Sequence, residues 1–121
     1  LAIAPNKAVI IDGNISAADL DSIANATTGA VTANISAGTV AATLAAISHV
    51  DGLGGNDTIT YTTNQTTVDA SDLVALAVKV DTLGVNTVNT VTEVYNTASL
   101  GTVVVNALNI TGNTEAVIIS S

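Results

Sequence analysis

Residues 31–49 read VTANISAGTVAATLAAISH, and the spacing of their apolar residues changes along the stretch. Apolar residues alternate with small or polar ones over Val31–Ile35, which is typical of a half-buried strand. Ser36 follows, where the N-cap of a helix would accept a free backbone N–H. Beyond it the apolar residues fall on one helix face: Val40, Leu44 and Ile47. The stretch predicts a strand, a sharp turn and a short helix, whose apolar residues share one core.

The helical half of this unit recurs twice. Residues 15–23 read ISAADLDSI and residues 68–76 read VDASDLVAL. In each, Ser16 or Asp69 is followed three residues later by an Asp, a capping box with Asp in place of Glu. The pattern predicts that both residues cap a helix.

The rest of the chain favours strands. Strand candidates rich in Val, Ile and Thr lie at 8–11, 58–63, 103–105, 107–110 and 116–119. The run Lys7-Ala-Val-Ile-Ile11 returns as Glu115-Ala-Val-Ile-Ile119. This repeat is either a chance event in a Val- and Ile-rich chain or the start of another copy.

These observations predict a β-rich fold with short helices, a strand–helix solenoid whose stacked repeats begin roughly 20–28 residues apart. The alternative is a compact antiparallel β-sandwich with short helical crossings. Residues 1–121 are interpreted as a single repeat module. Because the sequence begins at Leu1, we interpret it as a fragment or processed unit of a longer chain.

The composition excludes several classes of partner. The formal net charge is −8, with Lys7 and Lys79 as the only cations, which disfavours nucleic acid and anionic membrane surfaces. No run of apolar residues is long enough to insert into a membrane. Cysteine is absent, so neither disulfides nor thiolate sites are expected. The acidic surface suits cations, calcium above all, unless the acids serve only for solubility.

One stretch partly matches a calcium-binding repeat. Residues 52–59 read GLGGNDTI, against the pattern G-G-x-G-x-D-x-U-x, with Leu53 in place of the second Gly. Asp57 would supply a carboxylate and Asp51 a second one, so these two residues are the candidate metal ligands, and calcium is the only cofactor indicated. The alternative is an ordinary Gly-rich loop. A weaker oxygen cluster, Asp12, Asn14 and Asp19, is equally explained by a turn and a helix cap.

Nothing in the chain indicates catalysis. His49 is the only His, and Ser48, His49 and Asp51 are too close in sequence to imply a triad. No P-loop and no G-x-G-x-x-G motif is present. We therefore expect that the protein is not an enzyme.

Three phrases carry a resemblance to known proteins: ISAADLDSIANATTGAVTANIS at 15–36, GTVAATLAAIS at 38–48 and GLGGNDTITYT at 52–62. Within residues 8–94 the chain resembles repeat modules of very large secreted surface proteins of cyanobacteria and other marine bacteria, often exported by type I secretion beside RTX repeats. The resemblance implies an extracellular structural or adhesive role, with calcium only at residues 52–59.

The expected function is that of a structural module in a surface layer, filament or giant adhesin. Its expected partner is itself, as a head-to-tail homo-oligomer or as tandem copies. The alternative is a calcium-dependent binding module for a glycan or another surface protein.

Overall fold

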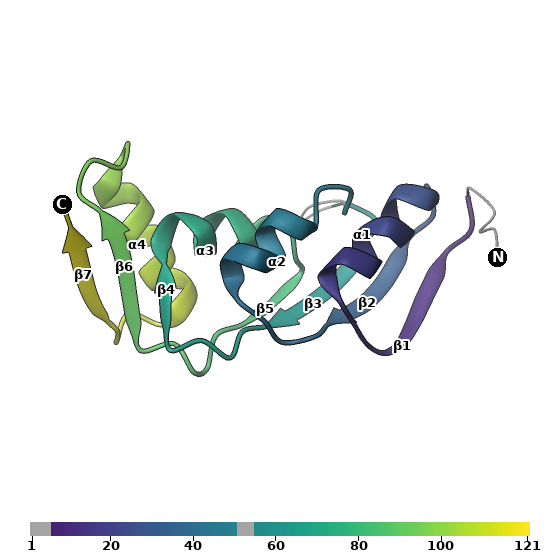
Figure 1. Ribbon diagram of the computed structural model, residues 1–121, viewed down its shortest axis with the longest axis horizontal. Helices are drawn as coiled ribbons and strands as arrows, with labels where there is room; N and C mark the ends of the chain where they lie inside the picture. Colours follow the sequence, from purple (N-terminus) through teal and green to yellow (C-terminus); the bar gives the residue numbers. More distant parts are fainter. Residues whose placement is uncertain (1–5, 51–54) are drawn as a thin grey trace.

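The computed structural model describes residues 6–50 and 55–121. Within these residues the chain forms four helices and seven strands (Figure 1). In chain order they are β1 (Val9–Ile15), α1 (Ala17–Ala26), β2 (Val31–Ile35), α2 (Val40–Ala46), β3 (Thr58–Thr62), β4 (Thr67–Asp69), α3 (Ala70–Ala77), β5 (Thr82–Gly84), β6 (Thr90–Val94), α4 (Leu100–Thr111) and β7 (Ala116–Ser120).

The strands form two parallel sheets. The first has the order β1-β2-β3-β5 and the second has the order β4-β6-β7. Paired residues are close to one strand–helix unit apart in sequence, as in Val9 with Val31 and Thr67 with Thr90. The helices lie along one side of the strands, and β1 and β7 lie at opposite ends of an elongated molecule (Figure 1).

Both expectations for the fold class are wrong. The protein is a mixed α/β structure with helices interleaved between the strands of two separate sheets, so it is not a β-rich solenoid. Every strand pairing in the described residues is parallel, which excludes the antiparallel sandwich. Parallel neighbours need a crossover between them, and the helices supply most of these crossovers. That residues 1–121 are a single repeat module stays a prediction.

The stretch 31–49 folds largely as expected. In β2 the side chains of Val31, Ala33 and Ile35 are buried and the residues between them are exposed. On α2, Val40 is buried, but Leu44 is only partly buried and Thr43 is buried in its place. The helix face is therefore rotated slightly from the expected one. Fully burying a Val or Leu side chain contributes about 1.5–3 kcal/mol, so this face anchors α2 to the strands.

Two of the three predicted caps are confirmed. The Ser16 hydroxyl accepts the N–H of Asp19 at 3.1 Å, and the Asp69 carboxylate accepts the N–H of Asp72 at 3.1 Å. The helix expected to start after Ser36 is instead capped by Thr39, which accepts the N–H of Ala42 at 3.1 Å. The turn before α2 is thus longer than the sequence pattern indicated.

Helix α4 replaces the two strands predicted at 103–105 and 107–110. The Val-rich run has weak helix propensity, but helix formation lets Ala107 become fully buried beside the partly buried Val103 and Leu108. Gly112 ends the helix in the left-handed conformation, with φ 105°, and its N–H donates to the Leu108 carbonyl. Packing of α4 against α3 and β6 therefore outweighs local propensity.

Candidate functional site

Two carboxylates that stand directly before strands join one strand–helix unit to the next. The Asp57 carboxylate, directly before β3, accepts the N–H of Val31 at the start of β2 at 2.9 Å. The Asp81 carboxylate, directly before β5, accepts the N–H of Ile59 in β3 at 2.8 Å. Each carboxylate therefore satisfies a backbone donor near the start of the neighbouring strand in the sheet, which gives both a structural role.

A buried carboxylate holds the start of α3. Glu93 on β6 is 4% exposed and accepts the N–H of Ser71 at 2.9 Å, together with the Ser71 hydroxyl. Its other oxygen accepts the N–H of Val94 at 2.8 Å and the Thr97 hydroxyl at 2.9 Å. Burial by itself raises the pKa of Glu93, but these hydrogen bonds outweigh burial and lower the pKa.

A second carboxylate lies at the same helix end. Asp69 caps α3, and its pKa is raised by burial and by the negative charge of Glu93, against the lowering effect of the Asp72 N–H. The free N–H groups of the first helical turn favour nearby negative charge. The pair therefore fixes α3 on β4 and β6.

The predicted metal ligands are only partly within the described residues. Asp51 lies outside them. Asp57 is 5% exposed and bonded to the backbone of Val31, a contact that spacing alone did not indicate. Among residues 6–50 and 55–121, no group of three or more His, Asp or Glu side chains is placed to hold a metal ion. A calcium site at Asp51 and Asp57 stays a prediction.

His49 contacts the carboxylate of Asp21, 28 residues earlier in the chain. Its Nδ1 lies 2.8 Å from Oδ2 of Asp21 on α1, and its backbone N–H donates to Oδ1 of the same residue at 2.7 Å. Burial raises the pKa of Asp21, but the contacts with His49 outweigh burial and lower it. Ser48 also contacts the ring, with its hydroxyl oxygen 3.2 Å from Nδ1. The pair links α1 to the segment after α2.

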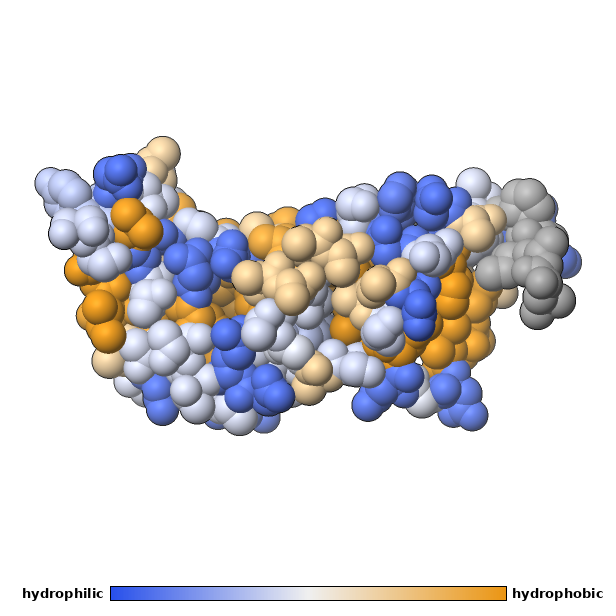
Figure 2. All heavy atoms as spheres, in the orientation of Figure 1, coloured by the Kyte–Doolittle hydropathy of each residue, from blue (hydrophilic) through white to orange (hydrophobic). Residues whose placement is uncertain are grey.

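The last strand of the chain carries exposed apolar side chains. Among the strands that the structure describes, β7 pairs only with β6, and all five of its residues are exposed. Its apolar side chains are 41–54% exposed: Val117, Ile118 and Ile119. Figure 2 shows the resulting apolar surface at the end where β7 lies in Figure 1.

The opposite end has a related strand. Strand β1 pairs only with β2 within the described residues, and its Ile10 is 79% exposed. Lys7 stands two residues before β1, and Glu115 stands one residue before β7. The Thr111 hydroxyl holds the pKa of Glu115 below its ordinary value, which favours the charged form. Within residues 6–50 and 55–121, both ends thus offer one unpaired strand edge with an exposed Ile and a flanking charge, and the charges are opposite.

No protein-family model, curated protein or solved structure gave a match to this chain. None of the helices described is both long and apolar enough to cross a membrane.

Proposed function

We propose that the protein is an extracellular structural module that associates with copies of itself end to end, within a surface layer, a filament or a large adhesin. The observation that carries the proposal is the exposed edge strand β7, whose apolar side chains have no covering element in the described residues. The resemblance to repeat modules of secreted surface proteins supports the extracellular location.

An open strand edge is a template for another strand, because its unpaired N–H and C=O groups can extend the sheet. Here the open edges of β1 and β7 lie at opposite ends of the molecule (Figure 1). Pairing β1 of one copy with β7 of another joins two different surfaces and leaves the edge at the other end of each copy open. A head-to-tail contact of this kind continues into a filament unless the geometry closes a ring.

The repeated sequence suggests the register of the contact. Aligning Lys7–Ile11 of one copy with Glu115–Ile119 of the next places Lys7 beside Glu115. The apolar residues of the two strands then also lie side by side. Because Lys7 is solvent-exposed and Glu115 is only partly buried, their pairing would fix the register, whereas buried Val and Ile would supply the affinity.

Disulfide trapping tests the contact cleanly, because the chain has no Cys of its own. The variants Lys7→Cys and Glu115→Cys are mixed and oxidised, and we expect a cross-linked dimer of the two. Positions 7 and 115 lie at opposite ends of one molecule, so the double variant should give a ladder of multimers and no internal disulfide. Ser22→Cys, exposed on α1, is the matched control partner and should cross-link with neither variant.

Light scattering across a concentration series measures the association itself. Ile118→Lys places a charge on the open edge and should abolish association while leaving the fold intact, because Ile118 is 54% exposed. A wild-type protein that stays strictly monomeric at millimolar concentration would contradict the proposal. Association without cross-linking of positions 7 and 115 would contradict only the register.

A further inference from the structure

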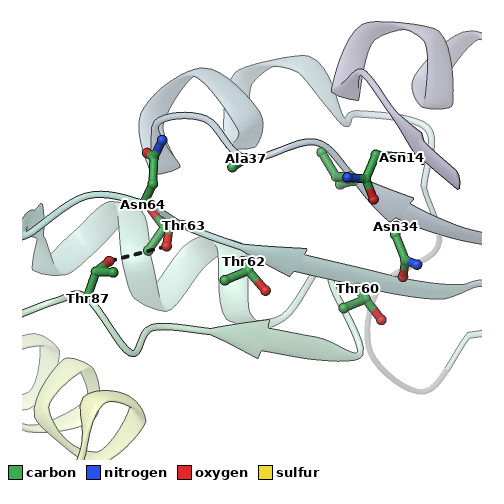
Figure 3. Close-up of a pocket in the computed structure, with 9 residues that line it drawn as sticks. Asn14, Asn34, Ala37, Thr60, Thr62, Thr63, Asn64 and Thr87 are labelled. Carbon is green, nitrogen blue, oxygen red and sulfur yellow. Dashed lines mark hydrogen bonds between the residues drawn. The ribbon is translucent and has the colours of Figure 1, made fainter.

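A hollow of about 480 Å³ lies on the first sheet and extends to the chain beyond its strands (Figure 3). Asn14, Asn34, Thr60 and Thr62 line it from strands β1, β2 and β3. Asn64 and Thr87 line the far end, and Ile35 and Ala37 add apolar surface. The volume falls within the range typical of small-ligand pockets, about 300–1,000 Å³.

The strand register places the polar residues in a row. Asn14 is paired with Asn34, and Asn34 is paired with Thr60. Neighbouring strands lie about 4.8 Å apart, so successive side chains of the row repeat at that spacing. Figure 3 shows Asn34 on β2 beside Thr60 on the adjacent strand β3, and Thr62 two residues further along β3. The row therefore crosses the strands and then turns toward the far end of the hollow.

The side-chain hydrogen bonds among the described residues include none from this row, whereas Thr63 and Thr87 of the same lining are hydrogen-bonded. Thr87, at the far end, donates its hydroxyl to the carbonyls of Thr63 and Gln65, and Gln65 in turn accepts the N–H of Val40. The far wall is thus held in place by internal bonds, whereas the row presents free amides and hydroxyls.

We propose that this hollow binds a neutral oligosaccharide, independently of any association between copies. Its lining contains no charged side chain, and the net charge of −8 repels anionic ligands. Amides and hydroxyls both donate and accept hydrogen bonds, as sugar hydroxyls require. The Thr methyl groups, Ile35 and Ala37 can contact sugar C–H groups. The spacing between strands is close to the rise per sugar of an extended polysaccharide.

The lining contains no aromatic residue, so each single site is expected to bind weakly. If copies are joined end to end, several hollows engage one long glycan, and avidity then exceeds the affinity of one site by about 10²–10⁴-fold. A weak, repeated site suits a structural module that lies against a polysaccharide.

The test uses backbone NMR of the full chain carrying Ile118→Lys, so that self-association does not affect the result. Neutral tetrasaccharides of β-1,4-glucan, α-1,4-glucan and mannan are titrated to high millimolar concentration, with oligogalacturonate as the anionic control. At least one neutral probe should give saturable shifts at Asn34, Thr60 and Thr62. Absence of saturable shifts with every neutral probe, or shifts with the anionic probe alone, would overturn the proposal.

Matched variants localise the binding. Asn34→Ala and Thr60→Val remove hydrogen-bonding groups from the row and should each weaken binding about tenfold, the effect of losing roughly one hydrogen bond. Thr32→Val is the control, because Thr32 is exposed on the same strand but does not line the hollow. Equal weakening by all three variants, or by none, would contradict the assigned site.

Discussion

Asp81 forms hydrogen bonds with both the backbone N–H and the backbone carbonyl of Ile59. The Asp81 carboxylate accepts the Ile59 N–H at 2.8 Å, and the Asp81 N–H donates to the Ile59 carbonyl at 2.8 Å. Asp57 has the corresponding position one unit earlier, where its carboxylate accepts the N–H of Val31. The triplets Asp57-Thr-Ile59 and Asp81-Thr-Leu83 share this arrangement. A carboxylate directly before a strand therefore fixes the start of its neighbour.

Asp81→Ala should destabilise the protein by about 1–3 kcal/mol, because the N–H of the buried Ile59 loses its acceptor. Asp81→Asn keeps an oxygen that can accept the same bond and should cost less. Asp12→Ala is the control, since Asp12 is exposed and should change the stability by less than about 0.5 kcal/mol. Urea unfolding measures all three, and equal losses for Asp81→Ala and Asp12→Ala would contradict the assignment.

The sequence correctly predicts those elements that depend on residues close together in the chain. The caps at Ser16 and Asp69 and the alternation over Val31–Ile35 depend on neighbouring residues, and the structure confirms them. The helix α4 was missed because its Val and Asn residues favour strands locally, and burial of Ala107 against other elements decides otherwise. The direction of strand pairing is likewise a property of distant segments, which no local pattern reports.

The candidate sites likewise include some features that the local sequence predicts and others that depend on distant segments. The apolar strands at the two ends are predictable from their Val and Ile content. The row from Asn14 through Asn34 to Thr60 depends on the register of three strands, which spacing along the chain does not give. The recurrence of Asp-Thr-Ile and Asp-Thr-Leu is a usable signal for the structural role of Asp57, whereas the neighbouring glycines indicate either a calcium loop or an ordinary Gly-rich loop.

Gly29 is required by a close approach between two segments. A Cβ at position 29 would lie 2.3 Å from the carbonyl oxygen of Lys7, which is backbone and cannot easily move aside. Gly29→Ala should therefore destabilise the protein by about 1–3 kcal/mol. Gly101→Ala in α4 meets no atom within 4 Å and should stabilise it by about 0.4–1 kcal/mol. Thermal unfolding of both variants checks the contrast, and a harmless Gly29→Ala would contradict the close packing.

Glu93 should make the protein sensitive to acid. Because the folded-state pKa of Glu93 lies below its ordinary value, its contribution to stability is present above the unfolded pKa, about 4.3. It is lost as the pH falls through the folded value. Glu93→Gln should cost about 1–3 kcal/mol at pH 7 and much less in acid. Urea unfolding between neutral pH and about pH 3 should show a flatter pH dependence for the variant.

Asp69 provides the internal control for this pH dependence. Its folded-state pKa is raised, so its contribution is present below the unfolded pKa, about 3.9, and is lost as the pH rises through the folded value. The two residues therefore act in opposite directions on acidification. Asp69→Asn should steepen the acid loss of stability that Glu93→Gln flattens. The same slope in both variants would contradict the assigned shifts.

Asp57 allows its structural role to be separated from the predicted calcium role. Asp57→Asn keeps a carbonyl oxygen for the Val31 N–H but removes the negative charge that calcium requires, whereas Asp57→Ala removes both. Without calcium we expect Asp57→Ala to cost about 1–3 kcal/mol and Asp57→Asn clearly less. If residues 51 and 57 bind calcium, millimolar calcium should raise the melting temperature of the wild type, and both Asp57→Asn and Asp51→Asn should abolish that rise. If calcium does not change the melting temperature of the wild type, while Asp57→Ala still lowers it, Asp57 has a structural role alone.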